Sequence, residues 1–257
     1  MKKKKKALAA LHITLPSKWS DLSAQQVQRV AYYRQSQLSE TEYLVRLAAE
    51  FADLKPRGSR VTESGEMEYR FYHRDRGNVW LSAEDMALVA DALRWTTGDP
   101  EPMAAPPLDG YTVPDSSLYG ISLEQFITAD TACAAYIRLK DERALRVMTA
   151  ALYPRRAFDP DSLEAEARRL ANWPMWQLMA VLMWFCGAKK ALCKKYPYVF
   201  STGDDAAAPI QGDELMMGLL SSLNDGRVAD NEQIRRIDIH EALFEVNRKI
   251  KASQSHV

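Results

Sequence analysis

Cysteine is scarce in this chain: only three of its 257 residues, Cys133, Cys186 and Cys193, carry a thiol. An odd number of cysteines cannot form a fully paired disulfide framework. All three lie in apolar, helix-like patterns, where a free cysteine behaves as a small hydrophobic residue. Because unpaired cysteines are typical of reducing compartments, we expect a cytoplasmic location.

The chain also lacks an excess of either charge, since 34 basic side chains balance 34 acidic ones. A balanced chain is not built as a whole to bind a polyanion, so nucleic acid is not the expected partner. Residues 1–14 are an exception, because Met1 is followed by five consecutive lysines. The apolar run behind these lysines is short and leads into no clear cleavage site, which favours a solvated, lysine-rich tail over a secretion signal.

No apolar run is long enough to cross a bilayer. The most apolar stretch, residues 173–188, is 16 residues long, whereas a membrane span needs roughly 18–20. Lys189 and Lys190 follow it, as cations often do at a helix C-terminus. We therefore predict a buried central helix over 174–195 and expect no membrane partner.

The sequence patterns of several large enzyme classes are missing too. There is no phosphate-binding loop, no dinucleotide-binding glycine pattern and no nucleophile elbow. His240 and Glu241 begin like a zinc-protease motif, but Phe244 stands where the second histidine ligand would be. We therefore predict no catalytic residue, cofactor or metal, and an enzyme of another chemistry stays open as a third alternative.

Helix-start signals, in contrast, are abundant. Ser23, Ser39, Ser122 and Asp230 each precede an apolar-periodic run and match or approximate a capping box. The segment 122–139 places its apolar residues at the i, i+3, i+4, i+7 spacing of an amphipathic helix. We predict a mainly α-helical protein with helices near 23–36, 40–54, 83–96, 122–139, 141–153, 161–171, 174–195, 213–224 and 231–251.

One segment has a different pattern. Residues 67–81 begin with alternating aromatic and polar side chains, continue through a turn-forming Asp-Arg-Gly-Asn and end in an apolar triplet, which predicts a small β-hairpin. In the favoured interpretation, the aromatic face of this hairpin packs on the helix that follows. In the alternative, Arg70, Tyr72 and Arg74 form a face that binds single-stranded nucleic acid by stacking and by charge, as part of a nucleic-acid-associated accessory protein.

A boundary is predicted where proline accumulates. Residues 98–115 contain five prolines and no basic residue, and proline both fixes φ and lacks a backbone donor, so this stretch continues neither a helix nor a central strand. We predict a two-lobed protein. Its parts are a helical lobe with the hairpin over 15–98, an acidic proline-rich linker over 99–115 and an all-helical lobe over 116–257.

Asp130 is a carboxylate that the helical spacing places within an apolar stripe. A half-buried aspartate can act as a catalytic acid with a raised pKa. Such a residue more often caps a helix or pairs with an arginine of a neighbouring helix, and we favour this structural role.

Three stretches carry a family resemblance. The first is Leu15 to Leu22, of the form P-x-x-W-x-x-L ahead of a Gln-rich helix; the second joins 123–130 to 150–154; the third runs from 184–190 to 196–200. In this order they resemble helical proteins encoded in bacterial prophages near the tail genes, where tail assembly chaperones are found. The resemblance implies a non-enzymatic role inside a bacterial host cell, in which the protein holds an aggregation-prone tail protein, such as a tape measure, during assembly.

A chaperone of this kind needs apolar surface for its client. We expect that surface on two mobile segments, the proline linker and the last helix, because a mobile amphipathic helix can dock against a partner. The same side chains would serve equally well as internal packing, so that alternative stays open. The predicted partner-binding residues are Met103, Leu108, Tyr111, Leu243, Phe244 and Val246.

Overall fold

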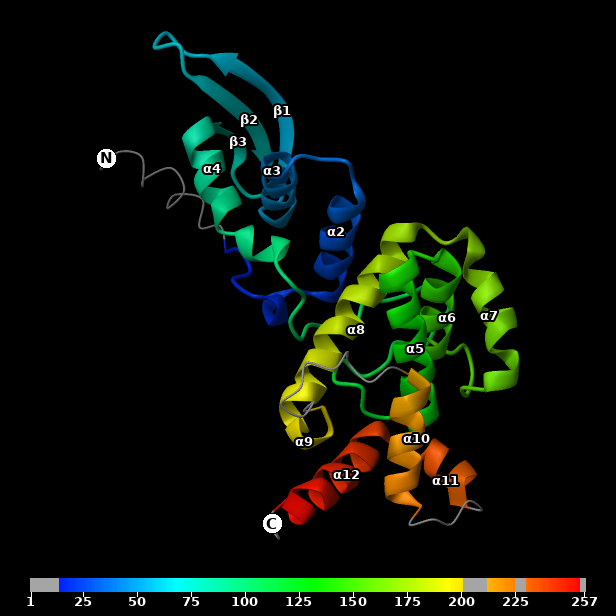
Figure 1. The fold of residues 1–257 in the computed structure, drawn as a ribbon. Helices are drawn as coiled ribbons and strands as arrows, with labels where there is room; N and C mark the ends of the chain where they lie inside the picture. The colour runs from blue at the N-terminus through cyan, green and yellow to red at the C-terminus, as the bar shows by residue number, and fades with distance from the viewer. Residues whose placement is uncertain (1–13, 201–211, 225–229, 255–257) are drawn as a thin grey trace. The chain divides into compact units, whose positions relative to one another are not determined.

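The computed structural model describes residues 14–200, 212–224 and 230–254. The chain forms two compact units that divide between Pro100 and Glu101 (Figure 1). Both units are mainly α-helical, and the first also contains a small antiparallel sheet. The predicted fold class, mainly α with a small β element, is confirmed.

Serine caps define the helix starts of the N-terminal unit. The side-chain oxygens of Ser23, Ser39 and Ser82 each accept the backbone N–H of the residue three positions later. Ser23 and Ser82 complete capping boxes, because the third residue returns a hydrogen bond to the cap. The helical elements of this unit are η1 (Trp19–Asp21), α2 (Ala24–Gln35), α3 (Glu40–Phe51), α4 (Ala83–Asp91) and η2 (Arg94–Thr97).

The β element is larger than predicted. The predicted hairpin is β2 (Met67–His73) and β3 (Gly77–Ser82), and an additional strand, β1 (Leu54–Val61), pairs antiparallel with β2. The helix predicted over 40–54 runs into the first residue of this strand, and no sequence pattern indicated the strand itself. The reason is that β1 is an edge strand, where proline and charged residues are tolerated and no alternation of apolar residues is needed.

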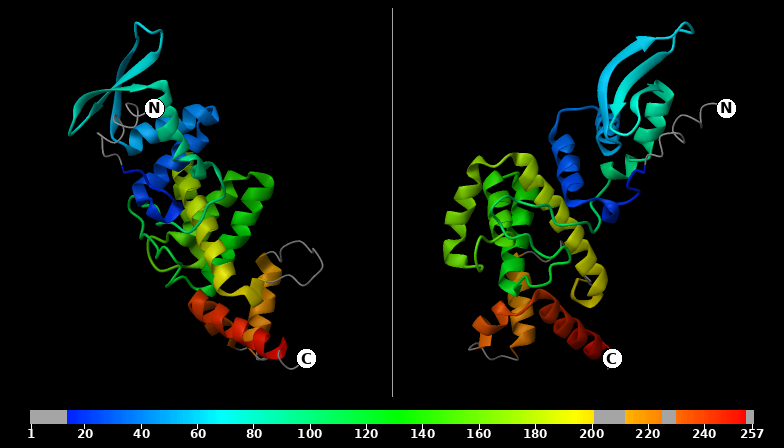
Figure 2. Two further views of the ribbon diagram at one scale, coloured as in Figure 1. Left: turned by 90° about the vertical axis from the view of Figure 1, so that its left-hand side faces the viewer. Right: turned by 180° about the vertical axis from the view of Figure 1, so that it is seen from behind.

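One face of this sheet packs against helices. Ala52, Leu54, Phe71, Leu81 and Met86 form a buried apolar cluster between the sheet, α3 and α4. The hairpin of β1 and β2 extends past these two helices, as the views from three directions show (Figures 1 and 2). The distal half of the sheet is therefore exposed on both faces as far as the described residues go.

The C-terminal unit is built around one long helix. This is α8 (Met175–Lys195), the predicted central helix, in which Leu178, Leu182 and Phe185 are buried while Trp176 and Met179 are half-buried. The other elements are α5 (Leu123–Leu139), α6 (Glu142–Leu152), η3 (Pro160–Ser162), α7 (Leu163–Arg169), η4 (Leu170–Asn172), α9 (Pro197–Phe200), α10 (Gly212–Leu223), α11 (Asn231–Arg236) and α12 (Ile239–Gln254). Trp184 of α8 and Tyr153 at the end of α6 are both fully buried, and their rings pack edge to face.

The proline-rich segment is not a free linker. From Glu101 onward it belongs to the C-terminal unit, and it lies as extended chain against the core of that unit. Carbonyl oxygens in this segment and directly after it accept hydrogen bonds from buried aromatic side chains: the Tyr153 hydroxyl donates to Pro106 at 2.8 Å and the Trp184 indole donates to Ser116 at 3.0 Å. The prolines exclude helix, as predicted, but the apolar residues between them pack as core.

Candidate functional site

The six predicted partner-binding residues do not form one exposed surface. Met103, Leu108, Leu243 and Val246 are all buried in the C-terminal unit. Tyr111 is half-buried, with its ring edge to face with Trp173 at 5.5 Å between centroids. Phe244 alone is exposed, at 61%.

The arrangement of α12 explains this difference. Its buried residues Ile239, Ala242, Leu243 and Val246 follow the i, i+3, i+4, i+7 spacing and form the stripe that packs inward. Phe244 falls off that stripe and faces solvent. The sequence left open that the six predicted partner-binding residues serve as internal packing instead. Four of the six do so.

The face of the sheet opposite the helices gathers arginines around a tryptophan. Arg70 and Trp80 are direct cross-strand partners. The guanidinium of Arg60 lies 4.1 Å from the centroid of the Trp80 ring, and that of Arg70 lies 5.8 Å from it. We call this surface the outer face and define it by Lys55, Arg57, Arg60, Arg70, Tyr72 and Trp80.

A β-bulge brings two further cations onto the outer face. The pairing of β1 with β2 shifts by one residue between Pro56 and Gly58, so that Lys55 pairs with Tyr72 while Arg60 pairs with Glu68. Lys55 and Arg60 are five positions apart, and a regular strand would point them to opposite faces. Arg57, the extra residue of the bulge, lies 5.5 Å from the centroid of the Tyr72 ring.

The structure thus places Arg70 and Tyr72 on one face, as the alternative interpretation of the hairpin required. Arg74 follows the end of β2 in the turn to β3. Sequence reasoning missed Arg57, Arg60 and Trp80. Their signal was weak, because only the pairing of β2 with β1 brings Arg57 and Arg60 to Arg70 and Tyr72, and only its pairing with β3 brings Trp80 there.

The inner face of the distal hairpin is apolar and exposed. Val61 and Met67 are cross-strand partners and Tyr69 follows Met67 on the same face; these side chains are 62%, 40% and 38% exposed. They continue the face that holds buried Phe71, beyond the point where the described helices cover it. We call these three residues the distal apolar patch.

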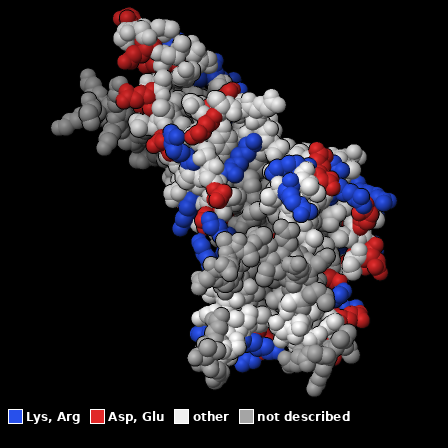
Figure 3. Space-filling model, in the orientation of Figure 1, with Lys and Arg blue, Asp and Glu red and all other residues white. Residues whose placement is uncertain are grey.

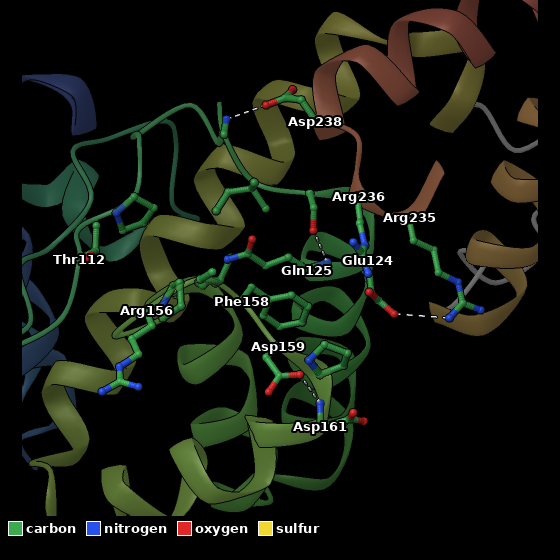
Figure 4. A pocket seen from close by; sticks show the side chains of 18 of the residues that line it. Thr112, Glu124, Gln125, Arg156, Phe158, Asp159, Asp161, Arg235, Arg236 and Asp238 are labelled. Atoms are coloured by element: carbon green, nitrogen blue, oxygen red, sulfur yellow. Dashed lines mark hydrogen bonds and ion pairs between the residues drawn. The ribbon is translucent and has the colours of Figure 1, made fainter. Parts of the chain in front are cut away.

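The C-terminal unit contains a large open cavity of about 1330 Å³, shown in Figure 4. It lies beside the start of α5, the loop before η3, and α11. Several charged groups around it are already engaged: Arg235 pairs with Glu124 at 3.4 Å, and Asp238 accepts the backbone N–H of Gly120 at 2.6 Å. These charged groups therefore hold α11 and the loop before α5 in place.

Asp130 has the structural role that we favoured. Its carboxylate is buried and forms an ion pair with Lys189 of α8, a lysine rather than the expected arginine. Burial opposes the charge of Lys189, but the adjacent Asp130 carboxylate outweighs it and raises the pKa of Lys189. Cys133 lies beside this pair, and its hydrogen bond to Cys186, together with burial, raises the pKa of the Cys133 thiol. Such a thiol is protonated at neutral pH and is a poor nucleophile.

His240 also has partners within the fold. Its ring stacks on Tyr119 at 3.9 Å between centroids, and its nitrogens lie 3.0 Å from the Tyr196 hydroxyl and 2.8 Å from the Ser117 carbonyl oxygen. These contacts fix the start of α12. Among the described residues no group of three or more His, Cys, Asp or Glu side chains is arranged to hold a metal ion, and none of their helices is long and apolar enough to cross a membrane.

Charges of both signs are interspersed over the face of the molecule seen in Figure 3. Comparison of the chain with protein-family models, with curated proteins and with solved structures finds no match.

Proposed function

We propose that the protein is a non-enzymatic assembly chaperone that holds an apolar segment of a phage tail protein, such as a tape measure, in the cytoplasm of a bacterial host. The observation that carries this proposal is the distal apolar patch of Val61, Met67 and Tyr69. Contiguous exposed apolar residues are typical of protein-interaction sites in soluble proteins. The resemblance to proteins encoded near prophage tail genes supplies the class of client.

The position of the patch suits a client of this kind. It lies on the projecting hairpin of β1 and β2, and the outer edge of β1 is not paired with any other described strand. An apolar helix of the client can lie across the patch without entering a preformed pocket, so binding depends on apolar area rather than on sequence. A long, repetitive helical protein presents such area many times.

The test is co-expression of the full chain with the tail proteins encoded beside it. We expect the double substitution Val61→Ser with Met67→Ser to lower the soluble fraction of the client. The matched control is Leu88→Ser, because Leu88 is 59% exposed on α4, close to the 62% of Val61, and lies outside the patch. We expect the control to leave client solubility unchanged.

Two results would contradict the proposal. One is client solubility that does not depend on the presence of the wild-type chain. The other is an equal loss of client solubility with the patch variant and with Leu88→Ser, since any exposed apolar residue would then support client binding. Phe244→Ser is a third variant in the same experiment. If this variant alone lowers the soluble fraction of the client, the docking surface lies on α12 instead.

A further inference from the structure

We propose that the outer face of the three-stranded sheet binds single-stranded nucleic acid without sequence preference. This inference goes beyond the chaperone proposal and does not depend on it, because the outer face and the distal apolar patch lie on opposite sides of the same strands. It rests on three features of the outer face: its net charge, its aromatic rings and the exposure of its arginines.

The local charge differs from that of the chain as a whole. Lys55, Arg57, Arg60 and Arg70 lie on the outer face, and Glu68 is the acidic residue among them, in an ion pair with Arg60 at 2.7 Å. Four cations against one carboxylate leave an excess of three positive charges. Three positive charges gathered on one face attract the negatively charged phosphate backbone of a nucleic acid.

The aromatic rings of Trp80 and Tyr72 provide the second contribution to binding, which is base stacking. Trp80 and Tyr72 are half-buried in the sheet, so each retains exposed ring surface, and each has a guanidinium beside it. Unpaired bases stack both on aromatic rings and on the flat face of an arginine side chain. Because every base has such a face, contacts of this type select for unpaired strands and not for sequence.

The basic side chains of the outer face are exposed to solvent. The Arg60 side chain is 55% exposed although it pairs with Glu68, and Lys55, Arg57 and Arg70 are exposed as well. A strand of six to eight residues spans about 20–25 Å, so phosphates along a short extended segment can meet several of these cations at once.

The experiment measures binding of fluorescently labelled oligothymidine and oligouridine to the full chain by anisotropy. With three net charges and a slope of about −0.7 per neutralised phosphate, log K should fall with log salt at about −2, or roughly 20-fold between 50 and 200 mM salt. Comparing the affinities for the two probes shows whether the outer face binds single-stranded DNA or single-stranded RNA more tightly. A duplex of the same length should bind more weakly, because its bases are not available for stacking.

Four variants test the residues. Arg60→Gln with Arg70→Gln should weaken binding at least about tenfold and flatten the salt dependence. Trp80→Leu should weaken binding while leaving the salt dependence unchanged, since it removes a stacking surface and no charge. Glu68→Gln should strengthen binding, because it removes the opposing carboxylate. The matched control is Arg46→Gln on α3, whose side chain is 54% exposed and pairs with Glu42 as Arg60 does with Glu68.

Far-UV circular dichroism checks that the variants fold. Because Arg60 and Arg70 are exposed, we expect their substitution to leave folding intact. The proposal is overturned if neither oligonucleotide binds, if Arg46→Gln weakens binding as much as the Arg60 and Arg70 substitutions, or if Glu68→Gln does not strengthen it. The proposal is also overturned if substitution of Arg60 and Arg70 abolishes binding of a protein client and leaves oligonucleotide binding unchanged. The outer face would then be a protein-binding surface.

Discussion

Replacing Gly187 by alanine should destabilise the protein, although the same change inside a helix normally stabilises it. Gly187 lies in α8 at the point where the extended chain of Glu101 and Pro102 crosses the helix. A Cβ added there would lie 2.3 Å from the carbonyl oxygen of Glu101 and 2.7 Å from its carbonyl carbon. These are backbone atoms, so no rotamer change relieves the contact.

The magnitude follows from two opposing effects. Alanine gains about 1 kcal/mol over glycine from helix propensity, whereas overpacking a core site typically costs about 1–3 kcal/mol. The contact at Gly187 is more than 1 Å too short, so the extended segment has to move, which disturbs the packing of Met103 and the ion pair of Glu101 with Lys190. For so short a contact we take the upper part of the overpacking range, about 2–3 kcal/mol, which leaves a net loss of about 1–2 kcal/mol.

Urea denaturation followed by tryptophan fluorescence measures this loss. The matched control is Gly218→Ala in α10, where an added Cβ has no neighbour within 4 Å, so that alanine should stabilise by about 0.5–1 kcal/mol. The reasoning fails if Gly187→Ala is as stable as the wild-type chain or if both substitutions shift stability in the same direction.

Two further predictions concern the core of the C-terminal unit. Leu182→Ala should lower the free energy of unfolding by about 2–5 kcal/mol, as for other buried leucines, and a loss below about 0.5 kcal/mol in urea denaturation would mean that this face of α8 is not core. Lys189→Met should lower the free energy of unfolding by about 2–4 kcal/mol, because it leaves the buried Asp130 carboxylate without its partner. Since Lys189 is partly exposed, this loss should not exceed the loss for a fully buried ion pair. Adding Asp130→Leu should recover part of that loss, and a double variant no more stable than Lys189→Met would argue against the pair.

Local signals in the sequence predicted much of the fold. Serines followed by a partner three residues later marked helix starts that the structure confirms at Ser23, Ser39 and Ser122, because capping depends on neighbouring residues alone. The apolar stretch before Lys189 likewise marked α8. Asp130 was assigned a buried pairing role from helical spacing, and only the identity of its cation differed.

Features that depend on tertiary packing were missed. Proline excluded helix after Pro100, but nothing local indicates that Met103 and Leu108 fill the core around α8. Strand β1 escaped detection because an edge strand needs neither alternation nor β-branched residues. Part of the outer face was missed for the same reason. Arg70 and Tyr72 belong to one strand and were predicted together, whereas Arg57 and Arg60 lie on β1 and Trp80 lies on β3.

The β-bulge at Arg57 links the sequence to both proposed surfaces. Side chains of a strand alternate between faces, so a shift of one residue exchanges the two faces completely. If Arg57 were paired instead of bulged out, pairing that kept Leu54 opposite His73 would turn Arg60 toward the helices and Val61 toward the outer face. Deleting Arg57 removes the bulge itself, so it should take one cation from the outer face while Arg60 stays opposite Glu68 and Val61 stays opposite Met67. Substitutions of Val61 and Met67, in contrast, alter one face and leave the other intact, so the two proposed activities can be lost separately.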